Sequence, residues 1–475
     1  MSKNFYITTT IPYVNADPHI GFALEIVHAD IIARYKKLAG FEVFFNTGTD
    51  EHGIKVWRKA SELGKETQAY VDESAAKYKE LLPVLGISED VHFIRTTSPA
   101  HKHAAEEFWK RCAAAGDIYK KNYKVKYCVG CELEKTDSEL AEGKCAIHPN
   151  LELEIIEEEN YFFRLSKYQD KLLALHEEQK DFVVPDFRLN EIRSLIKEKG
   201  LEDFSISRLK SKMPWGVAVP DDSAHVMYVW FDAFINYIST IGWPENMETF
   251  KKWWPVVQFA GKDQVRQQAV MWQAMLMSVG IEPSKQIVIH GFITSNGEKM
   301  SKSLGNVVDP VAIVNEYGTD ALRYYLARHV HPFEDSDFTM EKFKEAYNAN
   351  LANGLGNLVS RVMKMAETYL SEPVKIPENT IPQNFKDALD EYNIQKAVDI
   401  VWAFITSLDE LIQKTEPFKL IKTDKERAQK IIHDLVVDLY TVAWMLHPIL
   451  PETMEKIKKA VKENKMPEKP LFPRK

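Results

Sequence analysis

The sequence predicts an α/β protein with a parallel sheet, split by an insertion and followed by an all-α helical bundle. Strand-like and helix-like segments alternate over residues 1–117 and again after 225, which favours βαβ units. A polar stretch with a Cys/His cluster separates the two parts. From about Met340 onward, apolar residues recur at helical spacing. At 475 residues the chain is long enough for two or three domains.

The first part begins with "FYITTTI" at 5–11, a β-branched and apolar segment that predicts a buried strand. A turn at Pro18 leads into apolar residues at helical spacing over 20–38. A second predicted strand, "FEVFFNTG" at 41–48, is followed by helices over about 54–85. Because this order predicts a parallel sheet, binding sites are expected at the carboxyl ends of its strands.

Residues 118–224 are polar, and their apolar residues follow only short repeating patterns, so we interpret this segment as an insertion. After it the alternation resumes with predicted strands and helices in turn: strand "HVMYVW" 225–230, helix 231–240, strand "VVQFAG" 256–261, helix 263–280 and strand "QIVIHGF" 286–292.

The last part reads as helices separated by polar breaks, at about 341–370, 384–417 and 424–450. The Pro-rich segment "EPVKIPENTIPQ" at 372–383 is predicted to be a loop between two of them. Helices of this length joined by short breaks are typical of a bundle.

Composition excludes several function classes. The formal net charge of −8 argues against non-specific coating of DNA, although it permits a nucleic acid held by local basic patches. No apolar run approaches the roughly 20 residues that cross a bilayer. The first residues, "MSKNFYITTT", lack a long apolar signal segment, so a cytoplasmic location is expected.

Three of the four cysteines share a short stretch with a histidine, in the pattern "CVGC…CAIH". Three thiolates and an imidazole at this spacing suit a closed tetrahedral zinc site, formed by Cys128, Cys131, Cys145 and His148. Four protein ligands leave no open position, so the zinc is expected to be structural. The alternative is a set of reduced, unliganded cysteines. Cys112 lies on a predicted helix face and is expected in the core.

Two further motifs point to a nucleotide. "DPHIGF" at 17–22 resembles a His-x-Gly-His signature in which Phe22 replaces the second histidine. "NGEKMSKSLGN" at 296–306 places Lys299 and Lys302 three residues apart, where ammonium groups and flanking hydroxyls can meet a polyphosphate. A solvated basic loop is the alternative reading of the second motif, but the two occur together in one predicted sheet.

"HIGF" together with "KMSKS" resembles the paired signatures of class I aminoacyl-tRNA synthetases. The flanking segments "TTTIPYVNADPHIG", "NTGTDEHG", "YVWFDAFINY" and "AGKDQ" are most similar to the methionyl-tRNA synthetase family, in the same order along the chain. The resemblance implies three parts. A Rossmann-like catalytic domain has two halves, 1–117 and 225–340, separated by a connective insertion with a zinc knuckle at 118–224. A helical anticodon-binding domain follows at 341–475.

The resemblance also implies a two-step reaction. Methionine and ATP would give methionyl-adenylate and pyrophosphate, and the methionyl group would then move to the 3′ end of tRNA(Met). The attacking carboxylate is already anionic, so catalysis needs positioning and charge neutralisation, usually with Mg²⁺, rather than a general base. The residues matched to catalysis are His19, Lys299 and Lys302, and those matched to ATP binding are His19, Gly21, Phe22, Asp263 and Lys302.

For methionine, the family pattern matches Asp50 to the substrate ammonium group and other residues to the pocket that holds the thioether: Ile11, Tyr13, Trp230, Tyr237 and Gln268. Three positions depart from it. A β-branched residue or leucine is expected at Gln264, a histidine at Gln268 and a smaller residue at Phe234. Because a glutamine can still form hydrogen bonds, this pocket is expected to use different partners.

In the helical region, "LGNLVSR" places Asn357 and Arg361 one turn apart, and "TEPFKL" places Phe418 where the family usually has tryptophan. The resemblance implies that these side chains contact anticodon bases of tRNA. A helix cap or surface ion pair is the alternative for the first two. The expected partners are ATP, methionine and tRNA(Met), without DNA or membrane, and a monomer is expected because no oligomerisation module follows the bundle.

Other functions fit less well. Valine, isoleucine and leucine synthetases need a large editing insertion because a methylene contributes only about 1–3 kcal/mol of discrimination, and 118–224 is too short for one. The cysteine enzyme would need a cysteine near the first strand, which is absent there. A nucleotidyltransferase without tRNA would leave the bundle and the knuckle unused. A non-catalytic RNA-binding relative, suggested by Phe22, Gln264 and Gln268, is opposed by the intact lysine motif and Asp50.

Overall fold

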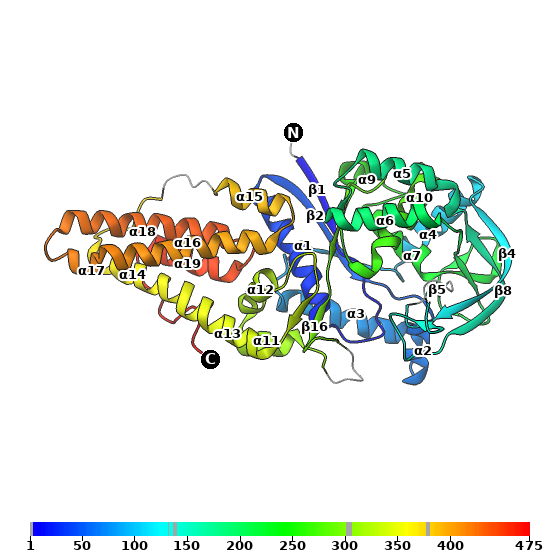
Figure 1. Cartoon of the computed structure of the whole chain (residues 1–475), viewed down its shortest axis with the longest axis horizontal. Helices are drawn as coiled ribbons and strands as arrows, with labels where there is room; N and C mark the ends of the chain where they lie inside the picture. Colours follow the sequence, from blue (N-terminus) through cyan, green and yellow to red (C-terminus); the bar gives the residue numbers. More distant parts are fainter. Residues whose placement is uncertain (1–2, 132, 136–139, 301–305, 377–380) are drawn as a thin grey trace.

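A six-stranded parallel sheet lies near the middle of the molecule in the computed structural model, between a helical bundle and a group of small antiparallel sheets (Figure 1). The structure describes residues 3–131, 133–135, 140–300, 306–376 and 381–475. The strands follow in the order β3 (His92–Arg95), β2 (Phe41–Thr49), β1 (Lys3–Thr8), β14 (Val256–Gly261), β15 (Gln286–His290) and β9 (Val183–Val184). All pairs are parallel, which confirms that the sheet is parallel. The strand predicted at 225–230 is not part of it, because β13 (Asp222–Met227) lies in a small antiparallel sheet.

Strand β1 lies between β2 and β14, so the chain order reverses beside it. Thr8 near the end of β1 pairs with Asn46 of β2 on one side and with Gln258 of β14 on the other. In sheets of this kind ligands bind in the crevice outside the carboxyl ends of the strands at the reversal point. The fold therefore places its natural binding site where the loops after β1, β2 and β14 meet.

Helices pack around the sheet and support these loops. Those from the first half are α1 (Ile20–Leu38), α2 (Ile54–Glu62), α3 (Thr67–Val84) and α4 (Pro99–Ala114). Those from the second half are α7 (Val229–Phe234), α8 (Asn236–Ser239), α9 (Met247–Trp253), the short 3₁₀ turn η3 (Lys262–Gln264), the π-helical turn η4 (Gln267–Met271), α10 (Trp272–Ser278), α11 (Pro310–Tyr317) and α12 (Thr319–Arg328). A small sheet, β17 (Glu298–Lys299), β16 (Ile293–Ser295) and β18 (Ser336–Phe338), follows β15.

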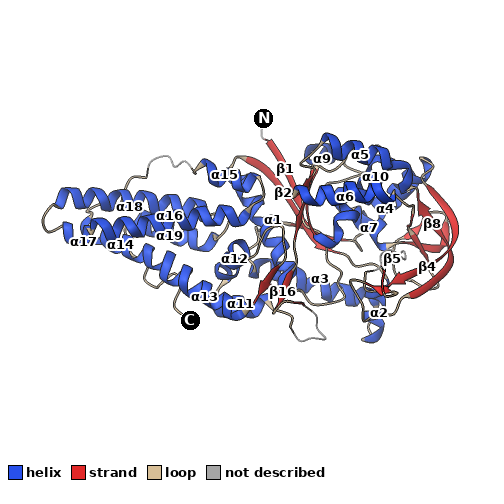
Figure 2. Cartoon of the chain, viewed as in Figure 1, coloured by secondary structure: helices blue, strands red, loops and turns tan. Residues whose placement is uncertain are grey.

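The insertion consists mainly of antiparallel strands, drawn at the right in Figure 2. The long pair is β4 (Ile118–Cys128) and β8 (Glu154–Phe163), flanked by β5 (Leu133–Lys135) and β10 (Phe204–Ser205). Two smaller groups are the hairpin β6 (Leu140–Ala141) and β7 (Lys144–Cys145), and the sheet β11 (Ser207–Leu209), β13 (Asp222–Met227) and β12 (Ala218–Val219).

Part of the segment expected in the insertion returns to the central sheet. After the 3₁₀ turn η2 (Leu165–Tyr168), helices α5 (Gln169–Glu178) and α6 (Asp186–Lys199) flank β9, which pairs with β15. Apolar side chains of both helices share a core with Val256 and Ile287 of the sheet. Sequence pattern missed this return because β9 has only two residues, too few to show a period.

The helical bundle comprises α13 (Met340–Ala346), the π-helical turn η6 (Tyr347–Gly356), α14 (Asn357–Tyr369), α15 (Gln383–Asp390), α16 (Ile394–Thr415), α17 (Pro417–Leu420), α18 (Lys425–Leu446) and α19 (Pro451–Glu463). One hydrophobic core is continuous from α1 of the sheet region into α16 and α18 of the bundle, so the two parts are packed together rather than merely tethered. None of the described helices combines the length and the apolar character needed to cross a bilayer.

Candidate active site

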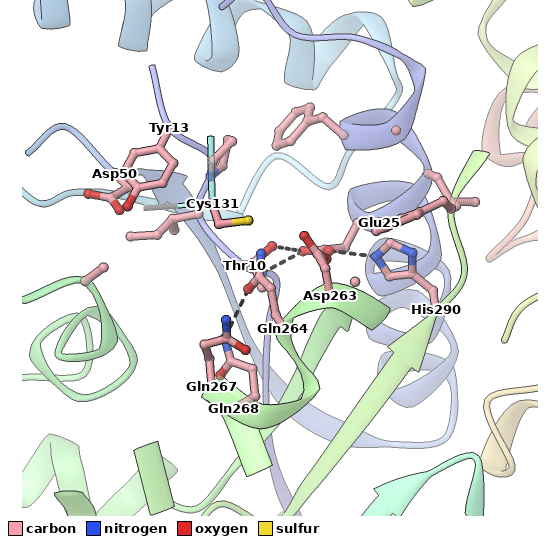
Figure 3. A pocket seen from close by; sticks show the side chains of 18 of the residues that line it. Thr10, Tyr13, Glu25, Asp50, Cys131, Asp263, Gln264, Gln267, Gln268 and His290 are labelled. Atoms are coloured by element: carbon pink, nitrogen blue, oxygen red, sulfur yellow. Dashed lines mark hydrogen bonds and ion pairs between the residues drawn. The ribbon is translucent and has the colours of Figure 1, made fainter. Parts of the chain in front are cut away.

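A cavity of about 430 Å³ opens at the carboxyl ends of β1, β2, β14 and β15 (Figure 3). Its wall brings together segments from both halves of the α/β region. Among the described residues, all those matched to methionine or to ATP line it: Ile11, Tyr13, His19, Gly21, Phe22, Asp50, Trp230, Tyr237, Asp263 and Gln268. Positions chosen from separate motifs thus meet at the reversal point of the sheet.

His19 caps the N-terminus of α1, and its Nδ1 accepts a hydrogen bond of 3.0 Å from the Gly21 amide. The imidazole lies directly over Gly21, where a Cβ atom would come within 2.8 Å of the ring. Any larger residue at position 21 would displace the His19 ring from this position. The helix N-terminus carries a partial positive charge, so the exposed His19 lies at an end suited to phosphate.

Phe22 contributes packing to the same turn. Its ring meets Tyr78 of α3 edge to face, with 5.1 Å between the ring centroids. The Tyr78 hydroxyl donates to the Ala16 carbonyl at 3.1 Å, which ties α3 to the segment before the helix. An aromatic side chain at position 22 thus supports the turn through α3.

Asp50 follows β2 and is held against the segment after β1. Its amide donates to the Pro12 carbonyl at 2.9 Å, and its own carbonyl accepts from Val14 at 3.3 Å. The side chain of Asp50 is almost fully buried and borders the cavity beside Tyr13 (Figure 3). A buried carboxylate beside an apolar wall is suited to an ammonium group.

An aromatic wall comes from α7 and α8. Trp230 packs on Phe234, and Phe234 and Tyr237 both contact Trp272 of α10. Trp230 Nε1 is buried and has no hydrogen-bond partner among the described residues. Phe234, the larger residue at a position expected to be small, fills the space between Trp230 and Trp272.

The two unexpected glutamines lie side by side in this wall. Gln268 Nε2 donates to the Tyr237 hydroxyl at 2.9 Å. It also approaches Gln264 Oε1 at 3.5 Å (Figure 3). The π-helical turn η4 begins at Gln267 and turns Gln267 and Gln268 toward the cavity. Turns of this kind are frequent at functional sites.

Sequence reasoning missed a polar cluster at the cavity floor. Glu25 of α1 accepts from the Thr10 amide and hydroxyl at 2.6 and 2.7 Å, and its second oxygen meets His290 Nε2 at 2.7 Å (Figure 3). Burial lowers the pKa of His290, but the Glu25 carboxylate outweighs it, and the pKa lies above its ordinary value. The signal was an acid within the apolar run "FALEIV", because a buried carboxylate needs partners.

A buried charged group supports the wall from behind. Asp232 of α7 accepts from His52 Nδ1 at 2.6 Å and from His101 Nε2 at 2.8 Å, and all three are buried. Burial raises the pKa of Asp232, but the two histidines hold it well below its ordinary value. His52 follows Asp50 in the chain, so this cluster fixes the loop after β2 against the helix that carries Trp230.

The lysine motif is only partly described. Lys299 ends β17, which pairs with β16 directly after the last large strand. Met300 lines the cavity, so the described part of the motif reaches the site. Lys302 lies outside the described residues.

Cys128, Cys131, Cys145 and His148 come together, with all four ligand atoms within 4.8 Å of one another. Cys131 Sγ lies 3.2 Å from His148 Nδ1 and 3.5 Å from Cys145 Sγ. Gly130 is required between them, because a Cβ there would meet the His148 ring at 2.5 Å. This donor set can bind a metal ion, and its softness and tetrahedral spacing fit zinc.

The metal-binding cluster borders the cavity. Gly130, Cys131 and His148 contribute to the lining, and Lys55 of α2 donates to the Gly130 carbonyl at 2.6 Å. The same Lys55 ammonium lies 5.2 Å from the centroid of the Tyr13 ring. A metal ion bound by this cluster would therefore support one wall of the site.

The residues matched to tRNA lie in the bundle, away from the cavity lining. Asn357 is exposed at the start of α14, and Arg361 one turn later donates to Asp409 of α16 at 2.8 Å. Phe418 is exposed on α17, directly after the end of α16. A base contacting Arg361 would share its guanidinium group with Asp409.

Two family models match the chain. The model described as tRNA synthetases class I (M) matches residues 5–150 and 130–363. The model described as the anticodon binding domain of methionyl tRNA ligase matches residues 370–470.

Several known proteins are similar over nearly the whole chain. The methionine–tRNA ligase of Thermotoga maritima is 43% identical over 98% of this chain and 76% of its own length. That of Nostoc sp. is 39% identical over 96% of this chain and 89% of its own length. The solved Mycobacterium tuberculosis methionyl-tRNA synthetase in complex with methionyl-adenylate has a TM-score of 0.90 at 38% identity, covering 96% of this chain and 93% of that one.

Proposed function

Because the chain belongs to the methionyl-tRNA synthetase family of class I, we propose that its cavity binds methionine and ATP together and is where methionyl-adenylate forms. The chain is a methionine–tRNA ligase in activity: it activates methionine with ATP, releases pyrophosphate and transfers the methionyl group to the 3′ end of tRNA. The observation that carries the site assignment is the meeting of the methionine-matched and ATP-matched residues in one cavity.

In the first step, a methionine carboxylate oxygen attacks the α-phosphorus of ATP, and the bond to pyrophosphate breaks. His19 at the N-terminus of α1 would stabilise the charge that develops on the phosphates, together with Lys299 and Lys302. Gly21 would allow the nucleotide to approach the backbone, Phe22 would pack beneath it, and Asp263 would border the ribose side, which fits their places in the cavity lining. Mg²⁺ bound with ATP would neutralise further phosphate charge.

Methionine would lie between β1 and the helix α8. Asp50 would bind the substrate ammonium group, which fits its burial beside the cavity. Ile11, Tyr13 and Trp230 would surround the side chain, and Tyr237 with Gln268 would face the sulfur. In this arrangement the reacting carboxylate of methionine would point toward the N-terminus of α1, where His19 lies.

We assign the catalytic domain to 1–117 and 225–340, the connective insertion to 118–224 and the anticodon-binding domain to 341–475, with α5, β9 and α6 of the 118–224 segment packed on the catalytic sheet. tRNA(Met) would contact Asn357, Arg361 and Phe418 in the last of these. The protein is proposed to act as a cytoplasmic monomer with one structural zinc per chain.

The test is amino-acid-dependent ATP–pyrophosphate exchange with a panel of amino acids. Methionine alone should support exchange, and it should do so without tRNA. Exchange with a different amino acid, or with none, would contradict the proposed function.

Removing the zinc should lower the exchange rate by about 100-fold, because misplacement of one wall by about 1 Å can cost that much. The measurement combines metal content per chain with exchange rate, before and after treatment with a chelator, and Zn²⁺ added back should restore both. Cys112→Ser is the matched control, since this cysteine is buried apart from the ligands, and it should keep one zinc and normal exchange. A metal-free protein with full activity would contradict the supporting role.

Replacing Phe418 by alanine should lower kcat/KM for charging tRNA(Met) by about 10- to 100-fold, the usual cost of losing one base-stacking contact. Methionine-dependent exchange should not change, because Phe418 is outside the cavity lining. Asn357→Ala should act in the same way.

Lys396→Ala is the control for these two variants, because Lys396 is exposed in the first turns of α16, at the opposite end from α17. It should charge tRNA normally. Equal charging by Phe418→Ala and Lys396→Ala would show that the anticodon contacts lie elsewhere.

A further inference from the structure

A chain of buried polar side chains runs behind the glutamines of the cavity wall. It joins Gln273 of α10, Ser284 in the segment before β15, Gln258 of β14, Gln268 of η4 and Tyr237 of α8. All five are buried, although the family resemblance singled out only the last two. We call Gln273, Ser284, Gln258 and Gln268 the amide relay.

The relay starts from a group whose direction is fixed. The Ser284 backbone N–H can only donate, so Gln273 must present Oε1 to it, at 2.9 Å. Gln273 Nε2 then faces the backbone carbonyl of Gln268 at 2.8 Å and the Ser284 hydroxyl at 3.2 Å. Because the carbonyl can only accept, both ends of the Gln273 amide agree on one orientation.

This orientation passes along the relay. The Ser284 hydroxyl accepts from Gln273, and its own buried proton is satisfied by Gln258 Oε1, at 2.6 Å. If Gln258 turned its amide nitrogen to this hydroxyl instead, that proton would lose this acceptor. Gln258 then directs Nε2 to Gln268 Oε1 at 2.9 Å. Gln268 is left with Nε2 toward the Tyr237 hydroxyl, also at 2.9 Å. A glutamine that could rotate freely is thus held as a hydrogen-bond donor to the tyrosine.

The orientation of Gln268 determines what the proton of the Tyr237 hydroxyl can do. Burial raises the pKa of Tyr237 well above its ordinary value, so the group is a neutral hydroxyl near pH 7. Its oxygen accepts from Gln268, and no described residue accepts its proton in a hydrogen bond. Tyr237 lines the cavity, so this proton is available to an acceptor on a ligand there.

We propose that Gln258 and Ser284 are positioning residues that hold Gln268 as a donor, so that Tyr237 offers its proton to the sulfur of methionine and selects it over a side chain with a methylene in that place. The inference rests on the proposed function. If Gln268 rotated by half a turn, its oxygen would accept the Tyr237 proton, and Tyr237 would no longer offer that proton to sulfur. A thioether is a weak acceptor, so the gain is modest but specific to sulfur.

The test compares methionine with norleucine, which carries a methylene in place of the sulfur, in ATP–pyrophosphate exchange. Gln258→Met keeps the size of the side chain and removes both hydrogen bonds, and it should lower the ratio of kcat/KM for methionine to that for norleucine about tenfold. Ser284→Ala, a smaller change that retains the fold if the first variant does not, should lower the ratio about threefold. The change should be mainly in KM for methionine, with KM for ATP unchanged.

Thr47→Val is the matched control. Thr47 is a buried residue of β2 whose hydroxyl is 2.8 Å from that of Thr9, and it belongs to neither the relay nor the cavity lining. It should leave the ratio unchanged. The proposal is overturned if the relay variants lower exchange with methionine and norleucine in equal proportion. It is also overturned if Thr47→Val lowers the ratio of kcat/KM for methionine to that for norleucine as much as the relay variants do. Absence of methionine-dependent exchange in the unmodified protein would instead refute the proposed function.

Discussion

Replacing His19 by alanine should lower the rate of methionine-dependent ATP–pyrophosphate exchange by about 100- to 1,000-fold, the usual cost of losing one group that stabilises transition-state charge. His19 is exposed at the cavity and begins α1, so the loss should appear in kcat rather than in the fold. Exchange kinetics, with circular dichroism to check helix content, would measure it.

His19→Asn separates the two roles of this residue. Asparagine is a strong N-cap and should keep the hydrogen bond to the start of α1, but it lacks the reach of the imidazole. His19→Asn should therefore lower the exchange rate nearly as much as His19→Ala does. Near-normal exchange in His19→Asn would show that His19 only caps the helix.

Phe22→His, which restores the missing second histidine of the motif, should change exchange by less than about tenfold, or 1.4 kcal/mol. Position 22 packs against Tyr78 in this protein, so its main role is to support the turn. Equal losses from His19→Ala and Phe22→His would contradict this division of roles.

Replacing Arg323 by methionine should destabilise the protein by about 3–5 kcal/mol, because it removes the fully buried guanidinium partner of a buried carboxylate and leaves buried carbonyl groups without their donor. Arg323 of α12 donates to Asp30 of α1 at 2.8 Å and also to the carbonyls of Ile449 at 2.9 Å and Leu85 at 3.1 Å. Ile449 lies just before α19, so one guanidinium group joins the sheet region to the bundle. Burial opposes ionisation of Asp30, but Arg323, Arg34 and Ser88 outweigh it and hold its pKa below the ordinary value.

Urea unfolding of Arg323→Met, Asp30→Asn and the double variant would measure this coupling. The double variant should be less destabilised than the sum of the single variants, since both single changes remove the same buried ion pair. Lys37→Met is the control, because Lys37 lies on α1 like Asp30 but pairs with the exposed Asp90. Loss of this exposed ion pair should lower the free energy of unfolding by less than about 1 kcal/mol. Equal effects of Arg323→Met and Lys37→Met would show that the buried pair does not join the two parts.

Most of the helices and strands could be predicted from local sequence pattern. Strand β14 has the predicted bounds, and α1 begins directly after the His19 turn, because apolar periodicity and helix caps are properties of neighbouring residues. The metal ligands were also readable, since Cys128 and Cys131, like Cys145 and His148, are close in the chain and need only a tight turn to converge. The comparisons confirm the family that the two nucleotide motifs indicated.

The sequence by itself therefore determined the layers of the fold, the family and the segments that surround the cavity. The tertiary structure alone decided which distant side chains meet: Glu25 with His290, Asp30 with Arg323, and Gln258 with Gln268 and Tyr237. No local period marks such pairs, because each exists only where packing buries two polar groups together and water can no longer satisfy them. For the same reason, what Gln268 does in place of a histidine depends on Gln258, which no motif includes.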